Sequence, residues 1–244
     1  MKLTKNFAML FLLISFFQVN AHAFAPGPSD SGLKTELYLQ VTKNHKAVGY
    51  NRAKSYLFGQ LHLEKDAEGY FVTDLYCKIH YTKGVGPGNL PDQNQLNTEH
   101  TWPQSKFVSG FPTETQKSDL HHLFPTDSKA NSTRGNFEFA EVTENQNLKN
   151  CDDSKSGPSV TTGGHTFFEP PTSHKGNVAR ALFYFSIRYK APISEAQEEF
   201  LRRWNQLDPV DDAEMARNNA IEKLQGNRNP FIDDAGLADK ISNF

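Results

Sequence analysis

The chain has 244 residues, of which 37% are hydrophobic and 22% are charged; these fractions are ordinary for a globular protein and exclude an intrinsically disordered one. The formal net charge is −2, which counts against a protein that holds nucleic acid tightly by neutralising many phosphates. An enzyme that turns over many sites needs no such affinity, and most of the acidic excess falls after residue 190.

The N-terminus has the three parts of a secretory signal peptide. A basic start (residues 2–5) precedes an apolar run from Phe7 to Val19 and the small-x-small site Ala21-His22-Ala23. The apolar run is short for a transmembrane helix, although an uncleaved anchor is the alternative. We expect cleavage after residue 23. Residues 24–244 would then form one secreted or periplasmic domain, a monomer with no membrane association.

Residues 33–102 are predicted to hold two helices and then two strands separated by a glycine-rich loop. The first strand is rich in β-branched and aromatic residues. Gly59 should end the second helix. In chain order the elements are helices over Leu33–Thr42 and Tyr50–Phe58, a strand over Phe71–Ile79, the loop Gly84–Pro91 and a strand over Asn97–Trp102.

After residue 150 the sequence predicts a surface loop over Cys151–Gly164 and then three helices. The helices cover Asn177–Tyr189, Ser194–Leu207 and Asp212–Leu224. The first is apolar on nearly all sides, so it should be buried, with Asn177 as its N-cap. Gly226 should end the last one. The fold class is therefore α+β: a mixed, helix-rich single domain.

Three side chains in these elements need a partner. Arg180 lies in the buried helix, where a charge is costly unless it is paired, so a structural ion pair is favoured over contact with substrate. Cys77 and Cys151 are the two cysteines of the chain. In an oxidising compartment they would form a disulfide, with two separate buried thiols as the alternative.

Residues 97–136 combine the side chains that metal-assisted phosphodiester hydrolysis needs. His100 can accept a proton from water near neutral pH. Mg²⁺ takes oxygen ligands, few of them from protein, and Glu99 and the amide of Asn131 fit this role, with Asn136 as a substitute for Asn131. Arg134 can bind phosphate as a planar fork. Adjacent side chains of an ideal strand point to opposite faces, so Glu99 and His100 would need a bend or bulge to share a site.

Composition and spacing also allow two functions other than a Mg²⁺-dependent nuclease. A secreted zinc-dependent phosphoesterase or other hydrolase would use His100, His121 and His122, although adjacent zinc-ligating histidines are unusual. A non-enzymatic secreted adhesin or DNA-binding module is the second alternative.

The motifs resemble those of the bacterial endonuclease I family, which are secreted and periplasmic non-specific nucleases with a ββα-metal (His-Me finger) active site. Those in the candidate site are Glu99-His100-Thr101-Trp102-Pro103, Asp119-Leu120-His121-His122-Leu123-Phe124-Pro125 and Asn131-Ser132-Thr133-Arg134-Gly135-Asn136-Phe137. Further similarities, placed outside the site, cover Val72–Cys77, Gly176–Ala181, Asp208–Asp211 and Gln225–Phe231. The resemblance therefore spans nearly all of the chain after residue 24.

The resemblance implies a single Mg²⁺, with Mn²⁺ as a substitute, held by Glu99 and Asn131. It implies that His100 lies on a β-hairpin and activates water, and that Asn131 lies on the following helix. The implied activity is cleavage of DNA, often of RNA too, with little sequence preference, to 5′-phosphate and 3′-hydroxyl ends.

One part of that family pattern has no counterpart here. Some members carry an arginine, thought to assist the leaving group, in a long insertion between the first two motifs. In this chain Gln104–Ser118 is short and offers only Lys106 and Lys117 as cations. We predict a Mg²⁺-dependent endonuclease with His100 and Arg134 as catalytic residues, and with Arg180, Lys106 and Lys117 as candidate substrate contacts.

Overall fold

The computed structural model describes residues 30–161 and 164–244; the expected signal peptide, residues 1–23, lies outside them. In chain order the helices are α1 (Asp30–Thr42), α2 (Tyr50–Tyr56), α3 (Thr113–Lys117), α4 (Ser128–Arg134), α5 (Lys175–Tyr189), α6 (Glu195–Leu207), α7 (Asp212–Gln225) and α8 (Pro230–Asp233). The strands are β1 (Glu64–Lys65), β2 (Tyr70–Thr73), β3 (His80–Tyr81), β4 (Leu96–His100), β5 (Leu123–Asp127), β6 (Lys155–Pro158) and β7 (Thr166–Glu169). Short 3₁₀ turns cover Gln104–Lys106, Leu120–His122, Thr172–His174 and Ala235–Lys240.

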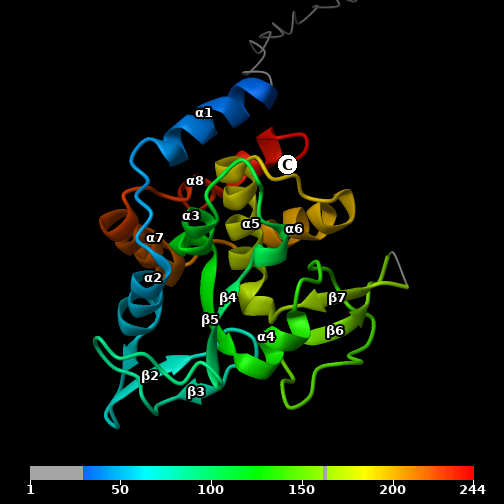
Figure 1. The fold of residues 1–244 in the computed structure, drawn as a ribbon. Coiled ribbons are helices and arrows are strands. Elements are labelled where there is room, and N and C mark those ends of the chain that lie inside the picture. The colour runs from blue at the N-terminus through cyan, green and yellow to red at the C-terminus, as the bar shows by residue number, and fades with distance from the viewer. Residues whose placement is uncertain (1–29, 162–163) are drawn as a thin grey trace, which may run out of the picture.

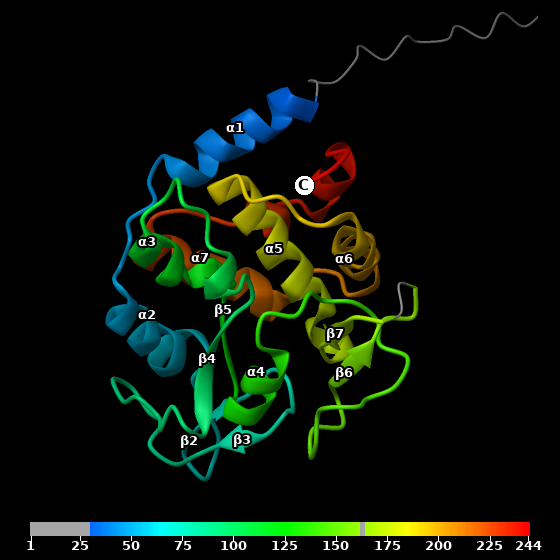
Figure 2. The same ribbon diagram turned by 45° about the vertical axis from the view of Figure 1, so that its right-hand side comes forward.

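The helices surround α5, and the strands form three small antiparallel sheets, which is the mixed α+β domain expected from the sequence. Both views place α5 in the middle, α1 at one end and β2 and β3 at the other (Figures 1 and 2). The sheet orders are β1-β2-β3, β4-β5 and β6-β7. Within the described ranges, no helix is long and apolar enough to cross a membrane.

Helix α5 is the buried helix predicted from its apolar sequence, but it begins two residues early. It starts at Lys175, so Asn177 is not its N-cap, and His174 before it makes no side-chain cap bond. The backbone N–H of Gly176 donates instead to the carboxylate of Asp208 at 2.8 Å. A β-carbon at Gly176 would lie 2.0 Å from the Asp208 carbonyl oxygen, so this close approach of α5 requires glycine.

Arg180 joins α5 to α7 through a buried ion pair with Glu214. Its Nη2 lies 2.6 Å from Glu214 Oε2 and its Nε lies 2.8 Å from Glu214 Oε1. Nη1 donates to the side chain of Asn205 and to the carbonyl of Asp208. The structural ion pair expected for this arginine is therefore present, and a guanidinium used in this way cannot reach a substrate in solvent.

Two predicted boundaries are wrong for identifiable reasons. The strand expected over Phe71–Ile79 ends at Thr73, because the carboxylate of Asp74 accepts the N–H groups of Tyr76, Cys77 and Ile79 and folds the chain into a turn. The loop expected over residues 151–164 contains strand β6, whose partner is β7. Local composition indicated a loop there, whereas pairing with a later segment made a strand.

The second helix also differs at its C-terminal end. Gly59 does not terminate it; the chain continues from α2 into a wider π-type turn over Leu57–Leu61. A β-carbon at Gly59 would lie 3.2 Å from the backbone nitrogen of Gly88, so glycine serves close packing here. By contrast, Gly226 ends α7 with a φ of 91°, as predicted.

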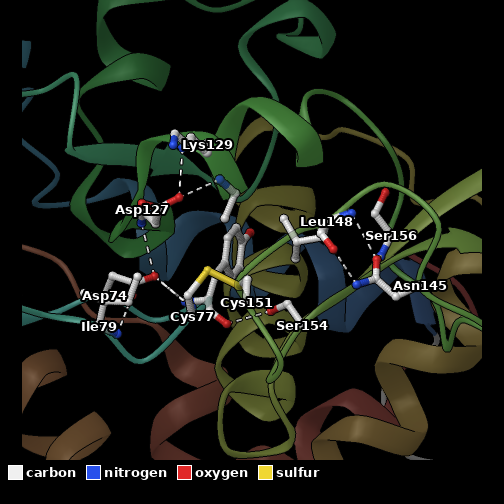
Figure 3. Close-up of a disulfide and its surroundings, with 12 residues drawn as sticks. Asp74, Cys77, Ile79, Asp127, Lys129, Asn145, Leu148, Cys151, Ser154 and Ser156 are labelled. Carbon is white, nitrogen blue, oxygen red and sulfur yellow. Dashed lines mark hydrogen bonds between the residues drawn. A yellow bond between two sulfur atoms is a disulfide. The ribbon is translucent and has the colours of Figure 1, made fainter.

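Cys77 and Cys151 form a disulfide, which confirms the first of the two alternatives (Figure 3). The bond ties the turn after β2 to the segment before β6. Next to it, the Ser154 hydroxyl donates to the carbonyl of Tyr76 at 2.8 Å. The backbone of Tyr76 is therefore fixed from both sides, by the Asp74 turn and by the disulfide-linked segment.

Replacing both cysteines by alanine should lower the free energy of unfolding by about 4 kcal/mol, because the bridge restricts the unfolded chain over a long loop. The two residues are 74 positions apart. Urea unfolding followed by tryptophan fluorescence measures the difference. The wild-type chain in a reducing agent should show the same loss, and equal stability of the oxidised, reduced and double-alanine chains would contradict the prediction.

Candidate active site

The candidate active-site residues lie on three consecutive elements. Strand β4 pairs antiparallel with β5, and α4 follows β5 directly. Glu99 and His100 are the last residues of β4, and Asn131 and Arg134 lie on α4. These four residues line one cleft of about 460 Å³. The cleft is completed by Tyr50, Asn97, Thr98, Pro103, Gln104, Ser105, Gly135 and Asn136.

Glu99 and His100 reach the same cleft without the bend or bulge that the sequence analysis required. Pairing of β4 with β5 is one-to-one to its end, where Glu99 faces Phe124 and His100 faces Leu123. His100 is the last residue of the strand, so the cleft can extend around the end of the strand and meet both side chains.

Glu99 is a buried carboxylate held by two partners from distant parts of the chain. The Tyr76 hydroxyl donates to Oε1 at 2.9 Å, and Nη1 of Arg134 lies 2.8 Å from the same oxygen. Burial raises the pKa of Glu99 above its usual value, although Arg134 and Tyr76 oppose this effect. Within residues 30–161 and 164–244, no described hydrogen bond or ion pair uses Oε2.

Asn131 leaves its amide oxygen free in the same way. Its Nδ2 donates to the carbonyl of Thr98 at 3.2 Å, which fixes the amide orientation because a carbonyl accepts only from the N–H side. No described hydrogen bond uses Oδ1. Glu99 and Asn131 thus line the same cleft, and each has one oxygen without a partner among the described residues; two such oxygens are the sparse oxygen set that suits Mg²⁺.

The ring of His100 is oriented by two hydrogen bonds. Nε2 lies 3.1 Å from the carbonyl oxygen of Lys117, and only a protonated ring nitrogen can donate to a carbonyl. A neutral ring therefore carries its lone pair on Nδ1, which lies 3.4 Å from the side-chain amide nitrogen of Gln104. This tautomer leaves Nδ1 as the nitrogen that can accept a proton.

The surroundings of His100 keep the imidazole neutral. Burial lowers its pKa to about 3, and the charges of His122, Lys117 and Arg134 act in the same direction, whereas the hydrogen bond to the Lys117 carbonyl opposes them. The His122 ring packs 5.5 Å from that of His100, centre to centre, and Phe107 packs at 6.3 Å. A ring held this way can bind a proton from water, and the negative charge of a bound phosphate would raise its pKa.

Arg134 points into the protein rather than into the open part of the cleft. Its side chain is 1% exposed. Besides Glu99, its Nη1 and Nη2 donate to the backbone carbonyls of His100 and Thr101 at 2.9 and 2.6 Å. The guanidinium also packs on the ring of Phe139. In this arrangement it holds the end of β4 and the Glu99 carboxylate, and it presents no free fork to a phosphate.

The family follows from comparison with known proteins. The family model described as Endonuclease I matches residues 29–236. The chain belongs to the Endonuclease I family. It is therefore an endonuclease, which excludes a non-enzymatic adhesin or DNA-binding module.

Curated relatives carry nuclease names. An extracellular ribonuclease of Bacillus subtilis (strain 168) is 31% identical over 236 residues, which cover 89% of this chain and 76% of the relative. An extracellular ribonuclease of Bacillus amyloliquefaciens is 32% identical over the same shares. An extracellular deoxyribonuclease of Aeromonas hydrophila is 32% identical over 117 residues, 48% of this chain and 49% of the relative.

In this Endonuclease I chain, the Asp119–His122 motif is structural and does not form a zinc site. His121 and His122 are buried, and their Nε2 atoms lie 3.1 and 2.7 Å from the carbonyls of Asn227 and Gln116. Among the residues that the structure describes, no group of three His, Cys, Asp or Glu side chains could hold a metal ion. The zinc ligand set of His100, His121 and His122 is therefore wrong.

The remaining predicted contacts are spread around the cleft. Asn136 lines its edge and donates weakly to Ser105. Lys106 is exposed and paired with Glu138 at 3.4 Å. Lys117 lies next to the cleft, with its Nζ over the ring of Tyr50. Arg180 is buried in its ion pair and does not line the cleft, so the structure contradicts its predicted contact with substrate.

Two residues of the site were missed from the sequence. Tyr76 belongs to the Val72–Cys77 similarity, which was placed outside the site, yet its hydroxyl contacts Glu99. Gln104 follows the Glu-His motif and bonds His100. The resemblance of Val72–Cys77 to the Endonuclease I family was the available signal for Tyr76; no comparable signal marked Gln104.

Proposed function

We propose that this chain is a Mg²⁺-dependent endonuclease that hydrolyses phosphodiester bonds of both DNA and RNA with little sequence preference. The observation that carries the proposal is that His100, Glu99 and Asn131 line one cleft, where Glu99 Oε2 and Asn131 Oδ1 have no protein partner among the described residues. In this proposal β4, β5 and α4 are the ββα-metal unit of the fold. The names of the relatives support both kinds of substrate, because some are called ribonucleases and others deoxyribonucleases.

In the proposed mechanism His100 is the general base. Its Nε2–H is held by the Lys117 carbonyl, so Nδ1 accepts the proton of the attacking water as the O–P bond forms. Attack opposite the leaving group breaks the P–O3′ bond, and the departing O3′ takes a proton from a solvent water, which gives 5′-phosphate and 3′-hydroxyl ends. Glu99 and Asn131 would hold the Mg²⁺, which supplies positive charge to balance the phosphate when it is bound.

Arg134 is a positioning residue in this proposal, in place of the catalytic role predicted from the sequence. It fixes Glu99 Oε1 and the carbonyls at the end of β4, so that Oε2 remains available for the metal ion. Its burial also explains why it cannot serve as the missing leaving-group cation.

We also propose that the enzyme acts outside the cytoplasm, in the periplasm or the medium. Several relatives are extracellular or periplasmic by name, and the disulfide between Cys77 and Cys151 is the type of bond that persists in an oxidising compartment.

Chelation tests the metal. Purified protein treated with EDTA and dialysed should lose cleavage of plasmid DNA and of RNA, and millimolar Mg²⁺ should restore it, with Mn²⁺ as a substitute. Stoichiometric zinc that survives purification, together with activity that only zinc restores, would overturn the proposal in favour of a zinc hydrolase.

Replacing His100 by alanine should lower kcat about 1,000-fold, because the proton acceptor is lost, while urea unfolding remains cooperative. His80→Ala is the matched control, because His80 is exposed on β3 away from the cleft. Plasmid nicking by His100→Ala at the wild-type rate, in a preparation still inhibited by EDTA, would remove His100 from the role of base.

Tyr76→Phe should raise the Mg²⁺ concentration needed for half-maximal activity about tenfold, because partners that orient a metal ligand typically have effects of this size. The maximal rate at saturating Mg²⁺ should change less. Tyr184→Phe is the control, since it removes a buried hydroxyl that bonds Asp119 instead of Glu99. An equal Mg²⁺ requirement in the two variants would show that Tyr76 does not position Glu99.

A further inference from the structure

A second hollow adjoins the active-site cleft and shares Tyr50 with it. Its volume is about 610 Å³. It is lined by Val48, Gly49, Tyr50, Asn51, Arg52, Glu114 and Lys117. Tyr50 therefore forms the boundary between the two hollows. Its ring centre lies 5.5 Å from that of His100, so the second hollow begins directly beside the base.

Three cations gather at this second hollow. Arg52 and Lys117 line it, and the Nζ atoms of Lys117 and Lys54 lie 4.4 and 4.9 Å from the centre of the Tyr50 ring. In the part of the chain that the structure describes, no salt bridge to a carboxylate is recorded for any of the three. Lys106 and Lys175, by contrast, each pair with a glutamate.

The lining of the second hollow contains one carboxylate, that of Glu114, and it accepts a backbone hydrogen bond. Oε1 of Glu114 accepts the backbone N–H of Tyr50 at 2.6 Å, which fixes the start of α2 beside α3. Three cations against one carboxylate give a local positive excess in a chain whose formal net charge is −2. Positive charge concentrated beside a cleft attracts a polyanion even when the net charge of the protein does not.

Lys117 connects this positive surface to the reacting centre. Its backbone carbonyl accepts from His100 Nε2, while its side chain extends over Tyr50 into the second hollow. A strand whose scissile phosphate lies at His100 and Glu99 would therefore have a neighbouring phosphate within reach of these cations. Arg52 can bind a phosphate as a fork, and the two lysines act as mobile point charges.

We propose that Arg52, Lys54 and Lys117 form a subsite for the phosphates that flank the scissile bond, with Tyr50 positioning the two lysines. The proposal rests on nucleic acid being the substrate. The subsite contacts backbone phosphates and no bases, so it confers no sequence preference. It favours polymeric strands over dinucleotides, because a dinucleotide has no flanking phosphate. It assigns a role to α2, which lies far before the Glu-His motif in the sequence.

Binding to a labelled strand tests the subsite without any turnover. The affinity of a fluorescein-labelled 20-nucleotide DNA single strand is measured by anisotropy over a series of NaCl concentrations, in the His100→Ala background. Adding Arg52→Ala and Lys54→Ala should weaken binding about tenfold at 0.1 M NaCl and reduce the slope of log K against log [NaCl] by about 1.4, or about 0.7 for each phosphate contact. Both sites are on α2, where alanine favours the helix.

The matched control also removes two positive charges, but at helix α1 instead of α2. Lys34→Ala and Lys43→Ala, on α1 and directly after it, should leave the slope unchanged. Helix α1 lies at the other end of the molecule from β2 and β3 (Figure 1). Equal slopes and affinities for the two double variants would overturn the proposal. Lys117 is kept, because its carbonyl holds His100.

The second experiment measures hydrolysis rates in the enzyme that retains His100. For the Arg52→Ala/Lys54→Ala enzyme, kcat/KM on the 20-nucleotide strand should fall about tenfold, while the hydrolysis rate of a dinucleoside monophosphate stays at the wild-type value. A parallel loss on the dinucleotide would overturn the subsite, because the side chains would then act at the reacting phosphate or through the fold. The binding arm compares two double variants in the same background and measures only the loss of charge contacts, so failure of the proposed mechanism and failure of the subsite are distinguishable.

Discussion

The buried carboxylate of Glu99 is the interaction on which the site depends. Its removal from water is costly unless a charge and hydrogen bonds compensate it, and the partners that do so come from separate parts of the chain. Arg134 comes from α4 and Tyr76 from the turn after β2. Arg134 also bonds the carbonyls of His100 and Thr101. One set of contacts therefore ties the end of β4 to α4 and holds the Oε1 atom of Glu99.

Residues outside the cleft hold the side chains that contact Glu99 and His100. Asp74 and the disulfide fix the backbone that carries Tyr76. On the other side, the buried carboxylate of Asp119 accepts from the hydroxyls of Tyr184 and Tyr189 and from the amide of Gln225. These contacts join α5 and α7 to the 3₁₀ turn that carries His122, against which the ring of His100 packs. The Asp-Leu-His-His motif thus supports His100, the proposed base, through packing and buried hydrogen bonds.

Much of the site could be predicted from the sequence because its residues lie close together along the chain. A hairpin followed by a helix brings Glu99, His100 and Asn131 to one cleft with only local connections. The buried helix and the pairing of Arg180 followed from the cost of exposing apolar groups and of burying a charge. The inward direction of Arg134 could not be predicted, because residue type alone does not distinguish a guanidinium that binds phosphate from one that braces a carboxylate.

The other errors have a common cause, which is that contacts between distant segments override local preference. Apolar and β-branched residues over 71–79 favour a strand, yet Asp74 captures three N–H groups and turns the chain so that Tyr76 reaches Glu99. Polar composition favours a loop at residues 155–158, yet β7 supplies a partner strand. The same reasoning applies to charge: a net value near zero describes the whole chain, whereas a polyanion meets only the side chains around one cleft. In the described structure Arg52, Lys54 and Lys117 have no carboxylate partner, whereas other cations such as Lys106 and Lys175 do. In the proposed subsite, the arrangement of ion pairs therefore decides where a strand binds. The sum of charges over the whole chain does not.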